Sequence, residues 1–307
     1  MTAEIIIPSR DGATLLRRNL PSVRRAAEAI GAGIAVVLDG PDPGAAPLLE
    51  GIRTLQLPAP AGYAAAVNAG VETSRAGVVI LLNNDMEPET LDGLTAGWRP
   101  EEFARTAASL NARQGGLDES PSVWTGEDGL FRVSHPVLGG GEPPPAGAPV
   151  AHAHGGASAC SREKWMALGG YSELFSPAYG EDVELSFRAW KRGWTVTYCP
   201  AARIRHHSAE TTGRFYDEKA RDRLVECHRL LFHLCALTDI ELIRSRDAAF
   251  QRIMESTYFD YDRWRLKVPL VGALSRMDAA NAHRNRHYRR EGLLTDREAF
   301  ARSGLFL

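Results

Sequence analysis

Along roughly the first hundred residues, short apolar runs alternate with longer segments whose apolar side chains recur every three or four positions. The short runs predict strands at residues 4–8, 34–38, 54–57 and 78–82, and the longer segments predict helices at 13–30 and 62–75. Because helices separate most of these strands, the pattern predicts βαβ units and a mostly parallel sheet. The expected fold class is therefore α/β.

Beyond this part of the chain the pattern changes twice. A strand is predicted at 106–110, but residues 112–150 are rich in glycine, proline and polar side chains and predict a long loop, which inside a domain is usually functional. Helices at 162–168 and 181–192 and a strand at 195–199 follow, and nearly everything from 215 onward has helical periodicity. We therefore expect one domain at residues 1–214 and a helical extension at 215–307.

Three polar residues end the most apolar of the predicted strands. Residues 78–82 are all apolar, as is typical of a strand buried on both faces, and Asn83, Asn84 and Asp85 follow directly. Open α/β sheets bind ligands at the carboxyl ends of their strands, and oxygen ligands there suit a divalent metal that carries a phosphorylated substrate. The alternative is a turn rich in Asn and Asp that caps a helix after Pro88.

The composition excludes several classes of protein. The chain of 307 residues has a formal net charge of -2, which gives no electrostatic basis for binding nucleic acid. Its four cysteines lack paired metal-ligand spacing and are expected to be reduced thiols of a cytoplasmic protein. No signal-peptide pattern opens the sequence, and no apolar run approaches the ~18 residues of a membrane-spanning helix.

Four motifs stand in a distinctive order along the chain. They are Ile7-Pro8-Ser9-Arg10-Asp11, the glycine-bounded segment 62–70, Leu81-Leu82-Asn83-Asn84-Asp85, and a segment at 180–188 that begins Gly180-Glu181-Asp182. Their order and spacing resemble the inverting family-2 glycosyltransferases of GT-A fold, particularly the rhamnosyltransferase-like branch, over about residues 4–212. The resemblance implies a nucleotide-diphospho-sugar transferase fold, with a mostly parallel central sheet flanked by helices and followed by a helical C-terminal extension.

The resemblance also implies a metal-assisted donor site. Asn83 and Asp85 match the family's Asp-x-Asp motif, so Asp85 is expected to bind Mg²⁺ or Mn²⁺, which stabilises charge on the departing diphosphate. Asn83 is expected to contact the ribose or a metal-bound water, and a single carboxylate predicts weak metal affinity without nucleotide. His206 matches a histidine at a strand end and is expected to complete the metal or diphosphate site, whereas His207 is one residue out of phase.

Inversion needs a base that takes the proton of the attacking hydroxyl. Asp182 matches the family's acidic residue at a helix start after a glycine-rich loop, and Glu181 is expected to hydrogen-bond on the acceptor side. The alternative is that both residues only complement the dipole of the helix N-terminus. Glu184 and Arg188, at i and i+4, are expected to be an ion pair on the helix surface.

Donor recognition is expected at the ends of the first two strands and at the start of a helix. In the resemblance, Pro8, Ser9 and Asp11 flank the nucleotide, Asn84 lies beside them, and Asp39 contacts the base or ribose. Arg10 stands where the family usually has an aromatic residue, so its guanidinium plane would have to replace the ring. Gly62 and Asn68 are expected near the phosphates, although Asn68 could equally be a helix-packing residue.

Two further groups of side chains have more than one interpretation. His152 and His154 occupy alternate positions, as a metal-binding pair on one strand face would, but no third ligand is apparent. The loop 155–159 sits where the family lines the acceptor pocket. Three tryptophans could stack on sugar there, although the helical spacing of Trp190 is more typical of a core residue; they are Trp165, Trp190 and Trp194.

Other classes of nucleotide-using enzyme fit these motifs poorly. The first strand is not followed by the Gly-x-Gly-x-x-Gly of a Rossmann dehydrogenase, and a P-loop is absent from the sequence. The glycine-rich, arginine-containing first loop of sugar nucleotidyltransferases is absent too. The remaining alternative is a nucleotide-sugar-binding or scaffold module of the same fold that has lost catalysis. Two departures from the family's pattern motivate it: Asn83 in the Asp-x-Asp motif, and Leu38-Asp39 where the family usually has an acidic pair.

The resemblance implies transfer of a hexose or deoxyhexose from a dTDP-, UDP- or GDP-linked sugar to a hydroxyl of a saccharide or lipid-linked acceptor, in building cell-envelope polysaccharide. The protein is expected in the cytoplasm. The C-terminal segment contains a cluster of four arginines, Arg284, Arg286, Arg289 and Arg290. They could contact the inner face of the plasma membrane, bind a partner subunit such as a second copy, or simply form a solvated helix face.

Overall fold

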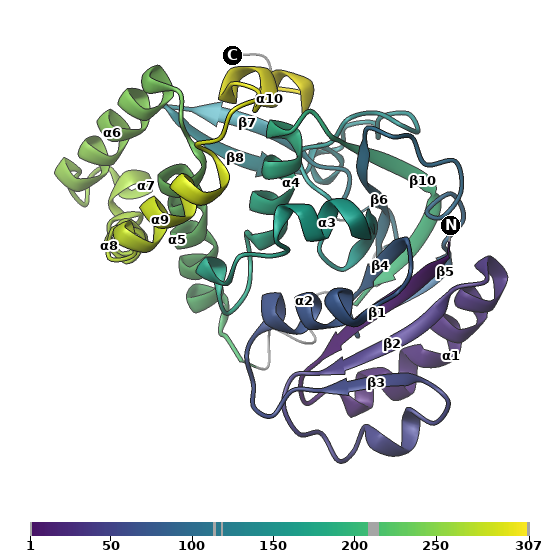
Figure 1. The fold of residues 1–307 in the computed structure, drawn as a ribbon. Helices are drawn as coiled ribbons and strands as arrows, with labels where there is room; N and C mark the ends of the chain where they lie inside the picture. The colour runs from purple at the N-terminus through teal and green to yellow at the C-terminus, as the bar shows by residue number, and fades with distance from the viewer. Residues whose placement is uncertain (1, 113–114, 118, 208–214, 306–307) are drawn as a thin grey trace.

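A computed structural model describes residues 2–112, 115–117, 119–207 and 215–305 of the chain. Its strands are β1 (Ala3–Ser9), β2 (Gly33–Leu38), β3 (Arg53–Gln56), β4 (Val78–Leu82), β5 (Met86–Thr90), β6 (Glu102–Asn111), β7 (Val123–Glu127), β8 (Leu130–Ser134), β9 (Ala157–Ser161) and β10 (Thr195–His206). All but β7 and β8 join one sheet in the order β3-β2-β1-β4-β9-β6-β10-β5 (Figure 1). The expected α/β class with a mixed, mostly parallel sheet is confirmed.

The N-terminal half of the sheet is buried on both faces because its strands are apolar at successive positions. In β1, Ile6 packs in the cluster that contains α2 (Tyr63–Thr73), whereas Ile5 and Ile7 pack with α1 (Ala13–Ile30) on the other face. This alternation is the period-two geometry of a strand. Figure 1 shows the two helices on opposite sides of β1 and β2. Because β1 runs parallel to β2 and to β4, the carboxyl ends of these three strands lie at the same edge of the sheet.

The other half of the sheet departs from a purely parallel arrangement. β9 runs antiparallel between β4 and β6, and β5 is antiparallel to β10 at the sheet edge. A helix after Pro88, one reading of the sequence, is wrong, because this residue lies in β5. Proline is tolerated there because an edge strand need not donate every backbone N–H to a neighbour.

The segment expected to be a long loop contains a β-hairpin. β7 and β8 pair antiparallel around a two-residue turn at Asp128 and Gly129, whose φ angles are 53° and 84°. Positive φ at both turn positions matches the twist of the flanking strands, and Asp-Gly is a favoured pair for it. Two short 3₁₀ turns, η1 (Ala46–Leu48) and η2 (Pro136–Gly139), lie elsewhere in the connections.

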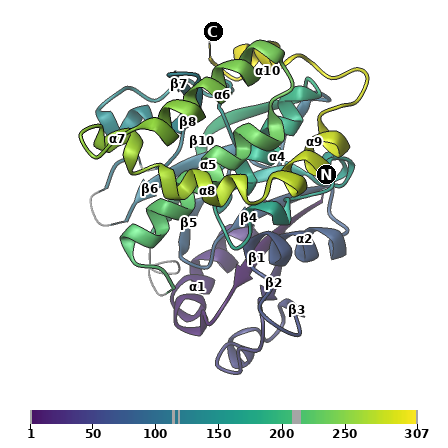
Figure 2. The ribbon, with the colours of Figure 1, turned by 90° about the vertical axis from the view of Figure 1, so that its left-hand side faces the viewer.

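The remaining elements are helical. They are α3 (Arg162–Leu168), the 3₁₀ turn η3 (Glu173–Phe175), α4 (Glu181–Lys191), α5 (Glu218–Ala236), α6 (Ile240–Glu255), α7 (Tyr261–Trp264), α8 (Lys267–Leu274), α9 (Met277–His287) and α10 (Asp296–Arg302). Figure 2 shows α8 and α9 following one another across the face of the C-terminal helices. Among the described residues, no helix is long and apolar enough to span a membrane.

An aromatic core joins the C-terminal helices to the hairpin and α4. The ring of Trp124 stacks on Phe232 at 5.4 Å and meets Phe300 edge-on at 5.1 Å, and Phe187 lies 4.8 Å from Phe300. These side chains come from β7, α5, α10 and α4, so the helices after residue 215 share one core with the preceding part of the chain. A boundary at residue 214 stays a prediction.

The ion pair of Glu184 and Arg188 lies inside the protein rather than on its surface, which corrects the sequence-based expectation. The two residues are 0% and 3% exposed because α9 covers this face of α4. Arg188 donates to Glu184 Oε2 at 2.8 and 3.0 Å, and His283 and Tyr288 contact Glu184 Oε1 at 2.8 and 2.7 Å. The pair therefore ties α4 to the C-terminal helices.

Candidate active site

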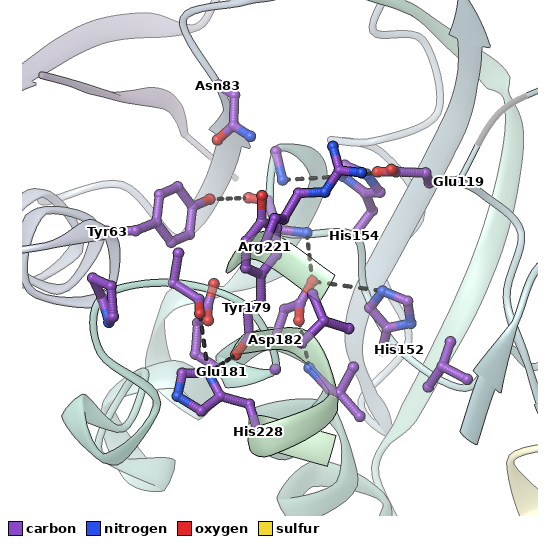
Figure 3. Close-up of a pocket in the computed structure, with 18 of the residues that line it drawn as sticks. Tyr63, Asn83, Glu119, His152, His154, Tyr179, Glu181, Asp182, Arg221 and His228 are labelled. Atoms are coloured by element: carbon purple, nitrogen blue, oxygen red, sulfur yellow. Dashed lines mark hydrogen bonds and ion pairs between the residues drawn. The ribbon is translucent and has the colours of Figure 1, made fainter. Parts of the chain in front are cut away.

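A cavity of about 690 Å³ opens at the carboxyl ends of β1, β2 and β4. One wall consists of these strand ends and of the first residues of α2 and α4. A second wall consists of residues from the β7–β8 hairpin and from α5, of which Figure 3 labels Arg221 and His228 of α5. Ten of the twelve residues expected to form the site line this cavity; they are Pro8, Ser9, Asp39, Gly62, Asn83, Asn84, Asp85, Glu181, Asp182 and His206.

 The two expected donor residues outside the lining are Asp11 and Asn68.

The ends of β1 and β4 are held together by hydrogen bonds between buried side chains. Asn84 Nδ2 donates to Ser9 Oγ at 3.0 Å, and Asn19 Nδ2, from α1, donates to the Asn84 carbonyl at 2.8 Å. Asn83 Oδ1, which is buried, has no hydrogen-bond partner among the described residues. A Cβ at Gly156 would lie 2.4 Å from the Asn83 side chain, so glycine is required for the close approach of β9. Asn83 therefore keeps an acceptor available at the cavity wall.

The residues expected near the base and phosphates fall into two groups. The Asp39 carboxylate accepts from the backbone N–H groups of Ala61 and Gly62 at 2.6 and 3.1 Å, which fixes the entry into α2. Asn68 brackets the backbone of Tyr171, accepting from its N–H and donating to its carbonyl, both at 2.8 Å. The structure therefore places Asn68 in a helix–loop contact.

Asp182 begins α4 with its carboxylate at the cavity. Its Oδ1 accepts from the Val183 N–H at 2.8 Å, and its Oδ2 accepts from the Gly155 N–H at 3.2 Å. His152 Nε2 lies 3.5 Å from the same Oδ2, and the other ring nitrogen lies 2.9 Å from Ser122 Oγ. Burial lowers the pKa of His152 to about 4, against the opposing influence of Asp182, so the ring is neutral near pH 7. Figure 3 shows the contact.

Glu181 lies beside Asp182 but in a different electrostatic environment. Burial, and then the charge of Asp182, raise the pKa of the Glu181 carboxyl well above its ordinary value. Its Oε2 is buried without a hydrogen-bond partner among the described residues. A neutral carboxyl group can donate a hydrogen bond as well as accept one. The two neighbouring acids are thus suited to different tasks.

The turn before α4 is held from the C-terminal helices. Tyr179 and Gly180 have φ angles of 73° and 90°, and His228 Nδ1, from α5, donates to the Tyr179 carbonyl at 2.8 Å. Positive φ is costly for a residue with a side chain, so this conformation depends on the surrounding contacts. α5 therefore helps to fix the position at which Asp182 enters the cavity (Figure 3).

A histidine- and carboxylate-lined region lies at the end of β10. Glu119, His154 and His206 each offer one ligand atom, and these atoms lie within 4.8 Å of one another. Asp85 and His206 line the same cavity, and the His207 N–H donates to the Asp85 carbonyl at 3.1 Å. Carboxylate and imidazole ligands fit a divalent ion such as Mn²⁺, so the residues present suit the expected metal. His152, by contrast, contacts Asp182.

Several residues of the cavity carry no local signal in the sequence. Glu119 and Arg221 reach it from segments distant from the strand ends, and Tyr63 OH donates to the Gly155 carbonyl at 2.6 Å. The Arg10 guanidinium lies 4.7 Å from the ring centre of Phe215, which also lines the cavity. An aromatic ring thus stands beside Arg10, supplied by the C-terminal part of the chain.

The tryptophans expected as sugar-stacking candidates do not lie at the cavity. Trp165 and Trp190 are each 1% exposed within the core, so the core interpretation of Trp190 is confirmed. The ring of Trp194 packs under the cations of Lys164 and Arg192, at 5.3 Å from each. None of the three residues lines the cavity. Helical spacing turns Trp165 and Trp190 toward the core, and Trp194 packs against the two cations instead.

Comparison with solved structures defines the fold class. The mannosyltransferase PcManGT of Pyrobaculum calidifontis, in complex with GDP-Man and Mn²⁺, matches 90% of this chain and 86% of its own, with a TM-score of 0.52 and 13% identity. GalNAc-T7 with UDP, GalNAc and Mn²⁺ matches 94% of this chain and 58% of its own, with a TM-score of 0.61 and 15% identity. The fold is therefore that of the GT-A glycosyltransferases.

Comparison of sequences agrees over shorter stretches. Residues 146–259 match the family model described as "Glycosyl transferase family group 2". N-acetylglucosaminyl-diphospho-decaprenol L-rhamnosyltransferase of Mycobacterium tuberculosis is 37% identical over 70 residues, which are 23% of this chain and 22% of that protein. The match thus spans about a fifth of the relative. These findings confirm the expected resemblance to family-2 glycosyltransferases, and the rhamnosyltransferase-like branch is supported over the short match alone.

Proposed function

We propose that this protein is an inverting glycosyltransferase that moves a hexose or deoxyhexose from a nucleoside-diphosphate sugar to a hydroxyl group. The observation that carries the proposal is the shared cavity, in which Asp182 faces the polar ends of the strands that hold Asn83 and Asp85. In the GT-A fold this edge of the sheet suits a nucleotide, because ligands bind at the carboxyl ends of parallel strands.

In the proposed reaction Asp182 acts as the general base. Its carboxylate takes the proton of the acceptor hydroxyl while that oxygen bonds to the anomeric carbon from the face opposite the diphosphate. The bond between the anomeric carbon and the diphosphate oxygen breaks, and the nucleoside diphosphate leaves with that electron pair. A backbone N–H on each carboxylate oxygen holds the base in place, and such a base contributes about 10²–10⁴-fold in rate.

Other residues of the cavity would orient the substrates. Ser9, Asp39, Gly62 and Asn84 are proposed to frame the nucleotide, and Glu181, whose pKa burial raises, is suited to hydrogen-bond the acceptor. Asp85 and His206 would hold Mg²⁺ or Mn²⁺, which supplies electrostatic stabilisation of the departing diphosphate when bound. The roles of Pro8, Asp11 and Asn68 stay predictions.

The far wall of the cavity supports a lipid-linked acceptor. It combines apolar rings from the hairpin and α5 with guanidinium groups, among them Trp124, Phe131, Phe232, Arg221 and Arg229. An acceptor that joins an apolar chain to a phosphate would match both kinds of side chain. The rhamnosyltransferase relative is named for a diphospho-decaprenol acceptor, which agrees with this chemistry.

Calorimetric titration with UDP, dTDP, GDP and CDP, each with and without Mn²⁺, tests the donor site. We expect one nucleotide to bind, and to bind more tightly with the metal, because the cavity offers oxygen and imidazole ligands beside the strand ends. The proposal would be contradicted if none of the four nucleotides bound at millimolar concentration, either with or without Mn²⁺. That result would favour a scaffold that has lost catalysis, an alternative supported by the amide of Asn83 in place of a carboxylate.

The C-terminal helices present a surface that suits a membrane. Exposed aromatic and branched side chains follow one another from the connection after α6 through α7 into α8; they are Tyr258, Phe259, Tyr261, Trp264, Val268 and Val271, and Phe259 is fully exposed. The exposed cations Arg286, Arg289 and Arg290 lie on and just after α9, which continues the course of α8 (Figure 2). Aromatic side chains beside cations suit the interface of an anionic bilayer. We therefore propose that this cytoplasmic protein contacts the inner face of the plasma membrane through this surface.

Vesicle co-sedimentation tests this contact. We expect the full chain to sediment with phosphatidylserine-containing vesicles and to remain in solution with phosphatidylcholine alone. Serine at Phe259, Val268 and Val271 should abolish sedimentation, because the variant removes apolar side chains that would enter the interface. Serine at the exposed Leu138 and Met166, which lie outside this surface, is the control. Equal sedimentation by both variants would remove the surface from membrane binding.

A further inference from the structure

The family's acidic motif is incomplete in this chain. Asn83 stands where the first carboxylate of the motif would lie, so Asp85 is the one carboxylate supplied by the end of β4. A divalent ion held by a single carboxylate keeps an uncompensated charge, and weak binding in the absence of nucleotide would follow. A second carboxylate from another part of the fold would change that outcome.

Glu119 brings a carboxylate to this position from the segment between β6 and β7. Its Oε2 lies 3.9 Å from His206 Nδ1 and 3.0 Å from His154 Nε2. Both histidines are buried, whereas the Glu119 side chain is 48% exposed, so its carboxylate meets the cavity from the solvent side. Glu119, His206 and Asp85 line the same cavity. Figure 3 shows Glu119 pointing to His154.

The hydrogen bonds of His154 assign it a supporting part. The Gly156 N–H donates to His154 Nδ1 at 3.1 Å, so this nitrogen has no proton. In the neutral ring the proton is then on Nε2, where it can be donated to Glu119 Oε2. A ring with its lone pair engaged at Nδ1 and its proton at Nε2 has no nitrogen left for a metal. His154 is therefore suited to orient Glu119, as partners of ligating carboxylates commonly do.

We propose that Glu119 is a ligand of the divalent ion and replaces the carboxylate that Asn83 lacks, with Asp85 and His206 as its companions and His154 as the residue that positions it. This inference rests on the proposed function for the presence of a metal. Two carboxylates and one imidazole favour a transition ion such as Mn²⁺ over Mg²⁺, which prefers oxygen ligands and retains water. The protein should then bind Mn²⁺ in the absence of nucleotide.

Titration of the full-length protein with Mn²⁺, followed by the electron paramagnetic resonance signal of the free ion, tests the ligand set without nucleotide or turnover. We expect Glu119→Gln to weaken Mn²⁺ binding at least tenfold. Glu142→Gln is the matched control, because this exposed residue of the connection between β8 and β9 does not line the cavity. Its affinity should equal that of the unchanged protein. Mn²⁺ binding by Glu119→Gln with unchanged affinity would overturn the inference.

Restoring the missing acid gives a sharper test. If Glu119 replaces a carboxylate at position 83, Asn83→Asp should recover Mn²⁺ binding in the Glu119→Gln background. Failure of this double variant to recover would refute the replacement. The outcomes also separate this inference from the proposed function. If nucleotide binding required Asp85 but not Glu119, Glu119 would not be a metal ligand, while the proposed donor site would stand. If the protein bound Mn²⁺ through Glu119 but bound no nucleotide, Glu119 would stand as a metal ligand and the proposed donor site would be contradicted.

Discussion

Asp182→Asn should abolish sugar transfer while the affinity for the nucleoside diphosphate stays within a few-fold of the unchanged protein. The amide is nearly isosteric with the carboxylate but cannot take the proton of an acceptor hydroxyl. A loss of about 10²–10⁴-fold in the rate of transfer is expected for removal of a general base. Initial rates of nucleoside diphosphate release, measured with acceptor present, and calorimetric titration with the nucleotide provide the two readouts.

The control for this variant is Asp92→Asn, an exposed carboxylate outside the cavity. It should transfer sugar at the rate of the unchanged protein. Near-normal transfer by Asp182→Asn would show that another group takes the proton. Loss of nucleotide binding together with transfer would instead assign Asp182 to the donor site.

Glu184→Gln should destabilise the protein by about 3–5 kcal/mol, because it leaves Arg188 buried without its counter-charge. The Glu184 side chain accepts from Arg188 and contacts His283 and Tyr288, so the change also weakens the attachment of α9 to α4. Chemical denaturation measures the free energy of unfolding. Glu241→Gln is the matched control, since Glu241 pairs with Arg244 at 2.9 Å on the surface and both side chains are more than half exposed. Exposed pairs contribute roughly 0–1 kcal/mol.

The same carboxyl group predicts a dependence of stability on pH. Burial alone would raise the pKa of Glu184, but the charges of Arg188 and His283 outweigh burial and hold it well below the ordinary 4.5. A lowered folded-state pKa means that the carboxylate stabilises the fold above pH 4.5 and loses this contribution as the pH falls further. The difference in unfolding free energy between the unchanged protein and Glu184→Gln should therefore narrow below pH 4.5. A difference that widened in acid would contradict the assignment.

Local sequence pattern accounts for the parts of the fold that could be predicted. The strand at Val78–Leu82 and the helices at Ala13–Ile30 and Arg162–Leu168 have the expected bounds, because each is an unbroken apolar or helical pattern. β9 was missed because Ala157–Ser161 consists of small and polar residues that pack between two other strands. The hairpin at Val123–Ser134 did have a signal, the Asp128-Gly129 turn, within a segment interpreted by its glycine and proline content.

The site was predictable to the extent that it lies at strand ends. Ser9, Asp39, Asn83 and Asp85 come to one cavity because the carboxyl ends of strands meet at one edge of a sheet, and the glycine before the helix at Glu181–Lys191 indicated where Asp182 begins that helix. Glu119 and Phe215 could not be assigned to it in this way. They reach the cavity through contacts between segments far apart in the chain, and such contacts leave no periodic pattern.

Trp124 gives the cavity an optical property. The chain has six tryptophans, and Trp124 is the one that appears among the residues lining the cavity. Its ring packs on Phe232, while its indole N–H has no hydrogen-bond partner among the described residues. Indole emission responds to the polarity around the ring, so a molecule seated against this wall alters the fluorescence of one identifiable chromophore. The protein thus carries an intrinsic label on the wall proposed for the acceptor, and occupancy there can be followed without an attached dye.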